Sequence, residues 1–348
     1  MIKDPFVLYR LPNEEEYHLI IDKGAHIIES LSALKENAFV IAAYENSTDT
    51  PIWAFSNKKS GLISKKDLDS LSIEVNFSSS NPALYIASQR EHQQVVNELI
   101  SEIKTSPLNK GVLSRIKSIE RKPEPLNLLF KKIAEKYSQA FVYVILLPNG
   151  QIWCGASPEV LANYRDEELQ TMALAGTQSI NKQEPTDLNW ENKEIEEQIW
   201  VQQHIIDIFT KLDIPYHKSE TYTRQAGHIG HLCTDFSCQI KQQNALNILE
   251  MLHPTPAICG SPTEAAKKAI SKYEKHKRDY YSGYIGLFAP DTFQLFVNLR
   301  CMQIQDSHYY LYVGGGITSD SDAKKEWLET ENKAITLSSI LSNSSLSQ

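Results

Sequence analysis

Strand-like segments that follow one another through tight turns dominate the second half of the chain. Phe141 to Leu147 is a β-rich run that ends at the turn signal Pro148-Asn149-Gly150. Residues 285–313 hold further strand-like runs, broken at Pro290-Asp291 and at 305–307. Strands joined by short turns pair antiparallel. The pattern therefore predicts antiparallel sheet and disfavours a repeated βαβ fold.

Helical periods lie between these groups of strands, in separate blocks. The strongest spans residues 192–212 and predicts one buried stripe formed by Ile195, Ile199, Ile206 and Phe209. Further helical periods occupy residues 90–104, 126–133, 262–278 and 324–341. Separate blocks of helices and strands predict an α+β fold. No linker or repeat divides the chain, so we expect one domain over residues 1–341 and a Ser-rich tail at 342–348.

Composition narrows the class of partner. The 348 residues are 41% hydrophobic, and the formal net charge of −8 disfavours nucleic acid as a partner. No apolar run reaches the ~18 residues of a membrane span, and no signal peptide is recognisable, so we expect no membrane partner. The five cysteines are odd in number and form no C-x-x-C pair, which predicts a reduced, cytoplasmic protein.

The segment from His253 to Gly260, His-Pro-Thr-Pro-Ala-Ile-Cys-Gly, follows neither a helical nor a strand period. Proline fixes φ and glycine permits unusual φ, so the run predicts a shaped loop. Such loops often line pockets, although an ordinary connector has the same pattern.

Two pairs of carboxylates lie at helical spacing. Glu194 and Glu197 border the predicted buried stripe of their helix, and Glu326 and Glu329 continue into Lys333 on another. Inward-facing carboxylates on two helices would repel each other unless a cation lay between them. Mg²⁺ prefers such oxygen ligands, so a metal site is one interpretation, and solvated helix faces are the other.

Gly314, Gly315 and Gly316 follow an apolar strand and are expected to end it, with N–H groups available to an anion. Lys110 and Arg300 lie within strand-like runs. Each would need an anion or a catalytic task if it pointed inward, and none of these signals is specific alone.

Ten short motifs, in order and covering about 110–333, resemble those of the chorismate-binding enzymes. That family includes isochorismate and salicylate synthases and the large subunits of anthranilate and aminodeoxychorismate synthases. The motifs are Lys110–Arg115, Gly155–Glu159, Ala173–Thr177, Asn192–Glu197, His231-Leu232, His253–Gly260, Tyr281–Gly283, Asn298–Arg300, Val313–Ile317 and Glu326–Thr330. The resemblance implies a single domain with two stacked, largely antiparallel sheets enclosed by helices, and a site in the cleft between the sheets. Residues 1–105 would supply further strands.

The resemblance also assigns roles by position. Lys110 matches the base that activates water for attack at C2 of chorismate, and Glu159 matches the acid that protonates the departing C4 hydroxyl. Such a lysine must be neutral and such a glutamic acid protonated, which burial favours in both cases. Water enters and hydroxyl leaves, which gives isochorismate.

The other matched residues would hold the metal ion and the substrate. Glu197 and Glu329 match the principal Mg²⁺ ligands, with Glu194 and Glu326 beside them. The substrate-binding positions are Gly176, Thr177, His231, Ala257, Tyr281, Arg300, Gly314, Gly315, Gly316 and Lys333. Three positions depart from the family pattern: Gln198 where His is frequent, Gln178 where Arg is common, and Gly111 where a β-branched residue follows the lysine.

The loop at Ala257 favours one family member. Isochorismate synthases resemble this chain in carrying Pro-Ala within a His-Pro-Thr-Pro-Ala loop, whereas salicylate and anthranilate synthases carry Thr there. Salicylate synthase is the alternative, and an aminating enzyme is less favoured because no glutaminase partner is expected. A non-catalytic scaffold would have lost Lys110 or Glu159. A metal-dependent hydrolase would need a tight histidine motif, and His228 and His231 lack an accompanying carboxylate.

Overall fold

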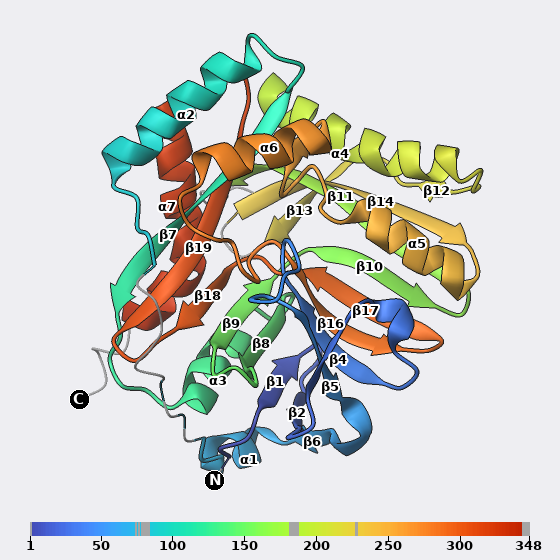
Figure 1. Ribbon diagram of the computed structural model, residues 1–348, viewed down its shortest axis with the longest axis vertical. Coiled ribbons are helices and arrows are strands. Elements are labelled where there is room, and N and C mark those ends of the chain that lie inside the picture. The colour runs from blue at the N-terminus through green and yellow to red at the C-terminus, as the bar shows by residue number, and fades with distance from the viewer. Residues whose placement is uncertain are drawn as a thin grey trace.

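Two antiparallel sheets lie face to face at the centre of the molecule, with helices on their outer faces (Figure 1). The computed structural model describes residues 2–73, 75, 77, 84–180, 188–226 and 229–342. The predicted α+β class with two stacked sheets is confirmed. His228 and residues 343–348 of the predicted tail lie outside the described residues.

The first sheet runs from the loop after His253 to the N-terminal hairpin. Its strands, in spatial order, are β15 (Gly260–Ser261), β7 (Lys110–Glu120), β19 (His308–Ile317), β18 (Cys301–Ile304), β9 (Ile152–Ser157), β8 (Phe141–Leu146), β1 (Phe6–Arg10), β2 (Tyr17–Ile21) and β6 (Gly61–Ile63).

The second sheet has a similar size. Its order is β12 (His217–Lys218), β14 (Ile229–Gln239), β11 (Glu168–Ser179), β10 (Val160–Arg165), β17 (Thr292–Val297), β16 (Tyr284–Ala289), β4 (Ala38–Ala42), β5 (Ile52–Ser56) and β3 (His26–Ile28), and β13 (Tyr222–Ala226) also pairs with β14. The region 1–105 thus adds strands to both sheets, as expected from the sequence.

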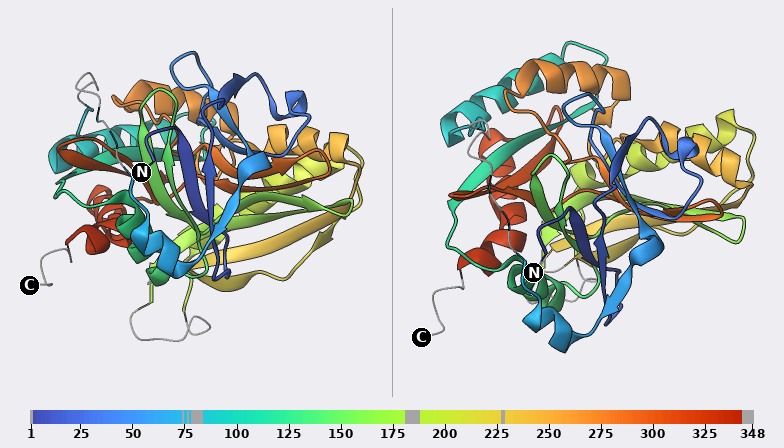
Figure 2. Two further views of the ribbon diagram at one scale, coloured as in Figure 1. Left: turned by 90° about the horizontal axis from the view of Figure 1, so that it is seen from below. Right: turned by 60° about the horizontal axis from the view of Figure 1, so that its bottom comes forward.

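Helices cover the two outer faces. They are α1 (Lys65–Ser70), α2 (Gln89–Ile103), α3 (Leu126–Lys136), α4 (Asn192–Lys211), α5 (Gln242–Leu252), α6 (Thr263–Tyr273) and α7 (Ala323–Ser342), with short 3₁₀ turns at Leu31–Ala33 and Asn57–Lys59. Helices α4 and α5 pack together on the second sheet, whereas α2 and α6 lie side by side near β7 (Figure 2). No helix of the described residues is long and apolar enough to cross a membrane.

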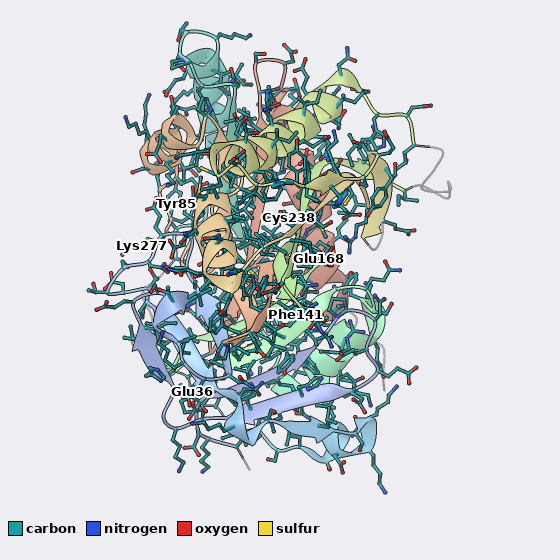
Figure 3. The ribbon with its side chains drawn as sticks, turned by 90° about the vertical axis from the view of Figure 1, so that its right-hand side faces the viewer. Glu36, Tyr85, Phe141, Glu168, Cys238 and Lys277 are labelled. Atoms are coloured by element: carbon teal, nitrogen blue, oxygen red, sulfur yellow. The ribbon has the colours of Figure 1, made fainter. Side chains whose placement is uncertain are left out.

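Aromatic residues from both sheets fill the space between them. Phe141 of the first sheet stacks on Phe296 of the second, with ring centroids 4.5 Å apart, and lies deep in the interior (Figure 3). Tyr9 and Phe39 join this cluster from the N-terminal strands. Buried aromatic rings supply much of the apolar area that holds two sheets together.

The chain crosses from one sheet to the other at several places, and two of these crossings lie next to each other. The first crossing, Pro158-Glu159, connects β9 to β10, and the second, residues 298–300, connects β17 to β18. Each crossing is hydrogen-bonded to the strand that leads into the other: Val297 N donates to Glu159 O at 3.0 Å, and Ala156 N donates to Arg300 O at 3.0 Å. The sequence reading missed the second crossing, because no turn signal marks residues 298–300.

Three further predictions are corrected. The helix predicted over 262–278 ends at Tyr273, and its last residues form a loop. The glycines 314–316 do not end their strand but continue within β19 to Ile317, paired with β7. Ile195 and Ile199 are 41% and 52% exposed rather than buried, because the buried face of α4 begins with polar Glu197 and Gln198.

Glycine at position 283 is required by the packing of β16 on β4. A Cβ there would lie 1.9 Å from Ala42 O, whereas a Cβ on Gly61 would meet nothing within 4 Å. We expect Gly283→Ala to lower the free energy of unfolding by about 3 kcal/mol or more, since backbone cannot move aside as a side chain can. Gly61→Ala should stay within about 1 kcal/mol of the parent. Urea unfolding of both variants checks this, and equal stabilities would contradict the described strand pairing.

Candidate active site

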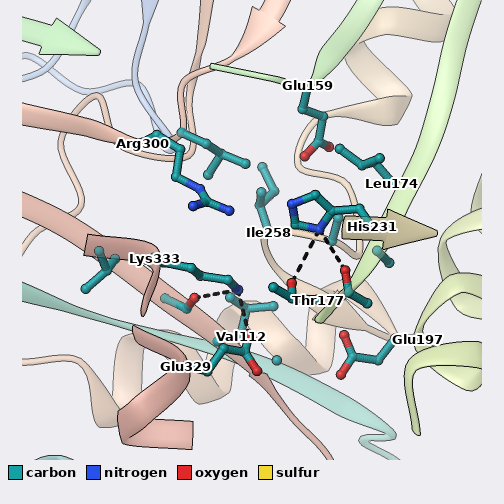
Figure 4. A pocket seen from close by; sticks show the side chains of 18 of the residues that line it. Val112, Glu159, Leu174, Thr177, Glu197, His231, Ile258, Arg300, Glu329 and Lys333 are labelled. Carbon is teal, nitrogen blue, oxygen red and sulfur yellow. Dashed lines mark hydrogen bonds and ion pairs between the residues drawn. The ribbon is translucent and has the colours of Figure 1, made fainter. Parts of the chain in front are cut away.

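One cavity lies between the two sheets, and its lining comes from almost every central element (Figure 4). It encloses about 80 Å³. Strands β7 and β19 form one wall, and β11, β14 and α4 form the other. The two sheet crossings and α7 close the remaining sides. The site is therefore built by residues that are distant in sequence.

Most residues that the sequence singled out meet in this cavity. Those lining it are Lys110, Glu159, Gly176, Thr177, Glu197, His231, Ala257, Tyr281, Arg300, Gly314, Gly315, Gly316, Glu329 and Lys333. Glu194 and Glu326 do not line it but lie just behind Gly176 and Gly315. The structure thus shows that the predicted site residues lie together, and the catalytic and binding roles assigned to them stay predictions.

Lys110 is held in a buried ion pair. Its side chain is 2% exposed, and Nζ lies 3.1 Å from Glu197 Oε2. Gly316 makes room for this pair, because a Cβ there would lie 2.6 Å from Lys110 Cε. Each glycine of the triplet admits a different group: Gly314 admits the Tyr281 hydroxyl, and Gly315 the Glu326 and Glu329 carboxylates. The triplet thus serves close approach by side chains rather than a turn.

Glu159 lies on the first sheet crossing and is 4% exposed. Its carboxyl group makes no ion pair with any described residue. Burial raises its pKa to about 8, although the charges of Lys110 and Arg224 act in the opposite direction. The group is therefore mostly protonated near pH 7 and can donate a proton. Figure 4 shows it on one side of His231, with Glu197 and Glu329 on the other.

Arg300 lies on the second crossing with φ of +48°, an uncommon conformation for a residue with a side chain. Its guanidinium group donates to Thr336 Oγ1 at 3.0 Å and forms no ion pair with the described carboxylates. Burial lowers its pKa to about 10, so it stays charged at pH 7. A half-buried, unpaired cation at a cavity wall is suited to bind an anion.

His231 is neutral. Burial lowers its pKa to about 3, with the charge of Arg300 contributing. Its Nδ1 lies 2.7 Å from the carbonyl oxygen of Gly176, so that nitrogen carries the proton and donates. Nε2 has no partner among the described residues and is left as an acceptor in the cavity wall.

The carboxylates at the base of the cavity are held by lysines. Lys193 Nζ lies 2.6 Å from Glu326 and 3.9 Å from Glu197, and Lys333 Nζ lies 2.7 Å from Glu329. Burial and the charge of Glu329 raise the pKa of Glu326. The sequence reading did not identify Lys193, although its i,i+4 spacing to Glu197 was visible.

The same carboxylates are the candidate metal ligands. Glu194 Oε2 and Glu326 Oε2 are buried and make no hydrogen bond with the described residues. Such oxygens suit a hard divalent cation, so the donor chemistry fits Mg²⁺. No three carboxylates of the described residues are already gathered around one point, because lysines lie among them. An ion would have to displace Lys193 or Lys110 from these groups.

The loop from His253 to Gly260 is fixed to β7 by a buried arginine that the sequence reading missed. Arg278 donates to Ile258 O at 2.7 Å and to Val112 O at 2.8 Å. Glu274 accepts from Arg278 at 2.7 Å and from the Ser114 backbone N–H at 2.6 Å. Both Ile258 and Val112 line the cavity. Arg278 therefore holds the loop beside the strand that carries Lys110.

The three departures from the family pattern have local explanations. A Cβ on Gly111 would lie 3.0 Å from the Leu99 side chain, so glycine lets α2 pack closely on β7. Gln198 is buried and donates to Ala173 O and Thr234 Oγ1, which ties α4 to the second sheet. Gln178 donates to Asn189 O outside the cavity. Some cavity-lining residues were given no role from the sequence, although all of them except Tyr312 lie within the matched motifs: Val112, Pro158, Leu174, Ala175, Ile258, Leu299, Tyr312 and Val313.

Comparison with known proteins points to one family. Residues 34–342 match a family model described as chorismate binding enzyme. The isochorismate synthase MenF of Haemophilus influenzae is 28% identical over 262 residues, which cover 73% of this chain. The matched segment spans only 61% of that relative's length.

Solved structures share the fold. MenF, the menaquinone-specific isochorismate synthase from Escherichia coli, superposes with a TM-score of 0.79 at 20% identity, over 97% of this chain and 89% of that one. Anthranilate synthase component I from Streptococcus pneumoniae superposes with a TM-score of 0.70 at 19% identity, over 97% and 93%. At these identities the likeness extends to the fold alone.

The Arg278–Glu274 pair should be essential for stability. Arg278→Met would leave the Glu274 carboxylate buried without its cation, which typically costs about 3–5 kcal/mol. Lys277→Met removes the neighbouring lysine, whose side chain is 76% exposed, and should cost less than about 1 kcal/mol. Urea unfolding compares the two. The double variant Arg278→Met/Glu274→Gln should recover part of the loss, and equal stabilities of the two single variants would refute the buried clamp.

Proposed function

We propose that the chain, which belongs to the chorismate-binding enzyme family, is an isochorismate synthase, an isomerase that converts chorismate to isochorismate. The observation that carries the proposal is the presence, in one cavity, of a buried lysine and a carboxyl group that is protonated near pH 7. The relatives' names support the choice of reaction. Paired groups of this kind are suited to add water at one carbon and remove hydroxyl at another.

Glu159 and Lys110 divide the proton transfers between them. Glu159 donates its proton to the C4 hydroxyl, which leaves as water. Lys110 takes a proton from the water that attacks C2. The ring double bonds shift as the new C–O bond forms and the old one breaks. One water enters and one leaves, so the overall change is an isomerisation.

The carboxylates at the cavity base would hold Mg²⁺. Glu197 and Glu329 line the cavity, and Glu194 and Glu326 stand behind them with unbonded oxygens. When bound, the ion would neutralise the C1 carboxylate of the substrate and orient it. Glu197 is also the ion-pair partner of Lys110, so metal and base share one carboxylate.

Cations of the cavity lining would hold the substrate's second carboxylate. Arg300 is half-buried and has no ion pair with the described carboxylates, and Lys333, which pairs with Glu329, also donates from Nζ to Gly314 O at 3.0 Å. His231 Nε2 can accept a hydrogen bond from a ring hydroxyl. Ala257 presents only a methyl group to the cavity, which limits polar contact from the loop.

The direct test is the product. The purified chain with chorismate and Mg²⁺ should give isochorismate, in the absence of glutamine and ammonium, and EDTA should abolish turnover. Separation of products by chromatography with mass detection checks this. Salicylate and pyruvate as dominant products would assign the chain to salicylate synthases instead, and anthranilate formed only with ammonium would assign it to the aminating branch.

The acid–base pair predicts a variant series. Lys110→Ala and Glu159→Gln should each lower kcat by about 10²–10⁴-fold, since each removes a proton-transfer group. Exposed residues of α6 supply matched controls, and Lys268→Ala and Glu264→Gln should keep the parent rate.

The pH dependence follows from Glu159. The acid form is lost as pH rises through about 8, so kcat/KM should fall on the alkaline side near that pH. The reason is that a deprotonated Glu159 cannot release the C4 hydroxyl. A profile of kcat/KM between pH 6 and 10 checks this, and full activity of Glu159→Gln would contradict the assignment.

A further inference from the structure

A second cavity adjoins the candidate active site. It encloses about 250 Å³, against about 80 Å³ for the inner cavity. Pro158 and Arg300, one from each sheet crossing, line both. The rest of its lining comes from the end of α3 and the segment that follows it, from Ala156 of β9, from β13 and from Thr336 of α7. The larger cavity thus lies directly outside the wall that carries Arg300 and the residue preceding Glu159.

This outer cavity is basic. Its lining includes Lys136, Arg224 and Arg300, and no carboxylate is among the residues that line it. None of the three cations forms an ion pair within the described part of the chain. Lys136 donates to Ser339 Oγ at 2.6 Å, and Arg224 contacts Met172 Sδ at 3.3 Å. On a protein of net charge −8, three cations that face one cavity without counter-charges form a local anion site.

The lysines of the inner site are arranged differently. Lys110 pairs with Glu197, and Lys333 pairs with Glu329. The cations of the outer cavity are therefore available to a ligand, whereas most of those inside are already neutralised. Arg300 lines both cavities. An anion bound in the outer cavity can therefore move into the inner cavity while it stays in contact with a positive charge.

Arg224 is directed toward the same region. In the β13–β14 pair, Arg224 lies opposite His231. Side chains of directly opposed residues project from the same face of a sheet, so Arg224 projects from the face on which His231 lines the inner cavity. The charge of Arg224 also opposes the rise in the pKa of Glu159, which burial causes. Both observations place Arg224 beside the acid.

We infer that the outer cavity is an entrance subsite, in which Arg224 and Lys136 bind the carboxylates of the dianionic substrate before it passes Arg300 into the inner cavity. The inference rests on the proposed function, which supplies the dicarboxylate. Its chemistry is charge-assisted hydrogen bonding to carboxylate, and no bond is made or broken there.

Arg224→Gln is the decisive variant. It should raise KM for chorismate about tenfold and leave kcat at pH 7 within twofold, because a charged hydrogen bond is lost while Glu159 stays protonated. Lys136→Gln should act in the same direction. The matched control is Arg165→Gln, an arginine whose side chain is 78% exposed and whose ionic contact is the neighbouring Asp166. It should keep the parent KM.

Ionic strength supplies a second readout. Plots of log kcat/KM against log salt should be less steep for Arg224→Gln than for the parent and for Arg165→Gln, since one steering charge is gone. The fall of kcat/KM at alkaline pH should occur at a higher pH in Arg224→Gln than in the parent. The reason is that removal of a positive charge raises the pKa of Glu159. A purely structural role for Arg224 would change neither the slope of the salt plot nor the pH at which kcat/KM falls.

The outcomes separate the two proposals. If the parent converts chorismate and Arg224→Gln matches Arg165→Gln in KM and salt dependence, the entrance subsite is wrong and the function stands. If the parent gives no isochorismate, the proposed function fails, and calorimetric titration with chorismate tests the subsite alone. Weaker binding to Arg224→Gln than to Arg165→Gln would support it. Inorganic phosphate that binds the parent without competition from chorismate would overturn it in favour of a phosphate site.

Discussion

The paired sheet crossings are the constraint on which the site depends. Each sheet is continuous on its own, and Pro158-Glu159 and residues 298–300 are two of the segments in which the chain passes from one sheet to the other. Each segment accepts a hydrogen bond from the strand that leads into the other, Glu159 O from Val297 N and Arg300 O from Ala156 N, so the two are held in place together. Because both leave the regular ladders deep inside the molecule, their side chains point into a low-dielectric gap. Glu159 and Arg300 owe their positions, and the direction of their pKa shifts, to this arrangement.

Two kinds of buried charge follow from that geometry. Lys110, Lys193 and Lys333 are matched with carboxylates, which offsets the cost of desolvation. Glu159 and Arg300 have no such partner among the described residues. The first therefore stays neutral, and the second stays charged and needs an anion. Charges at the base of the site are neutralised by one another, whereas Arg300 and Glu159 at the crossings have no ion-pair partner. Such a site is suited to bind a small dicarboxylate through Arg300 and to donate a proton to it from Glu159.

Local patterns in the sequence correctly predicted those helices and strands whose apolar side chains lie on one face at regular spacing. The strand at Lys110–Glu120 and the helices beginning near residues 90, 192 and 324 were predicted within a few residues. The motifs also grouped most cavity residues correctly, although they are spread over more than 200 positions. The order of the motifs along the chain allowed this grouping, whereas the helical and strand periods do not indicate which distant residues meet.

The failures share a physical cause, which is the long-range pairing of polar groups. Ile195 and Ile199 form an apolar pair, yet the buried face of α4 starts with Glu197 and Gln198, because a lysine and a carbonyl from distant strands satisfy them. The Arg278 clamp joins segments whose partners are invisible locally. Such contacts are decided by the assembled fold.

The central claim is that Lys110 delivers water to C2 of chorismate while Glu159 releases the C4 hydroxyl. The most direct measurement is turnover in water enriched in ¹⁸O, followed by mass analysis of isochorismate. The account predicts one ¹⁸O atom in the product, located at the C2 hydroxyl, because the oxygen at C4 departs and solvent supplies its replacement. Isochorismate without the label would mean that the hydroxyl migrates within the substrate, and it would contradict the roles given to both residues.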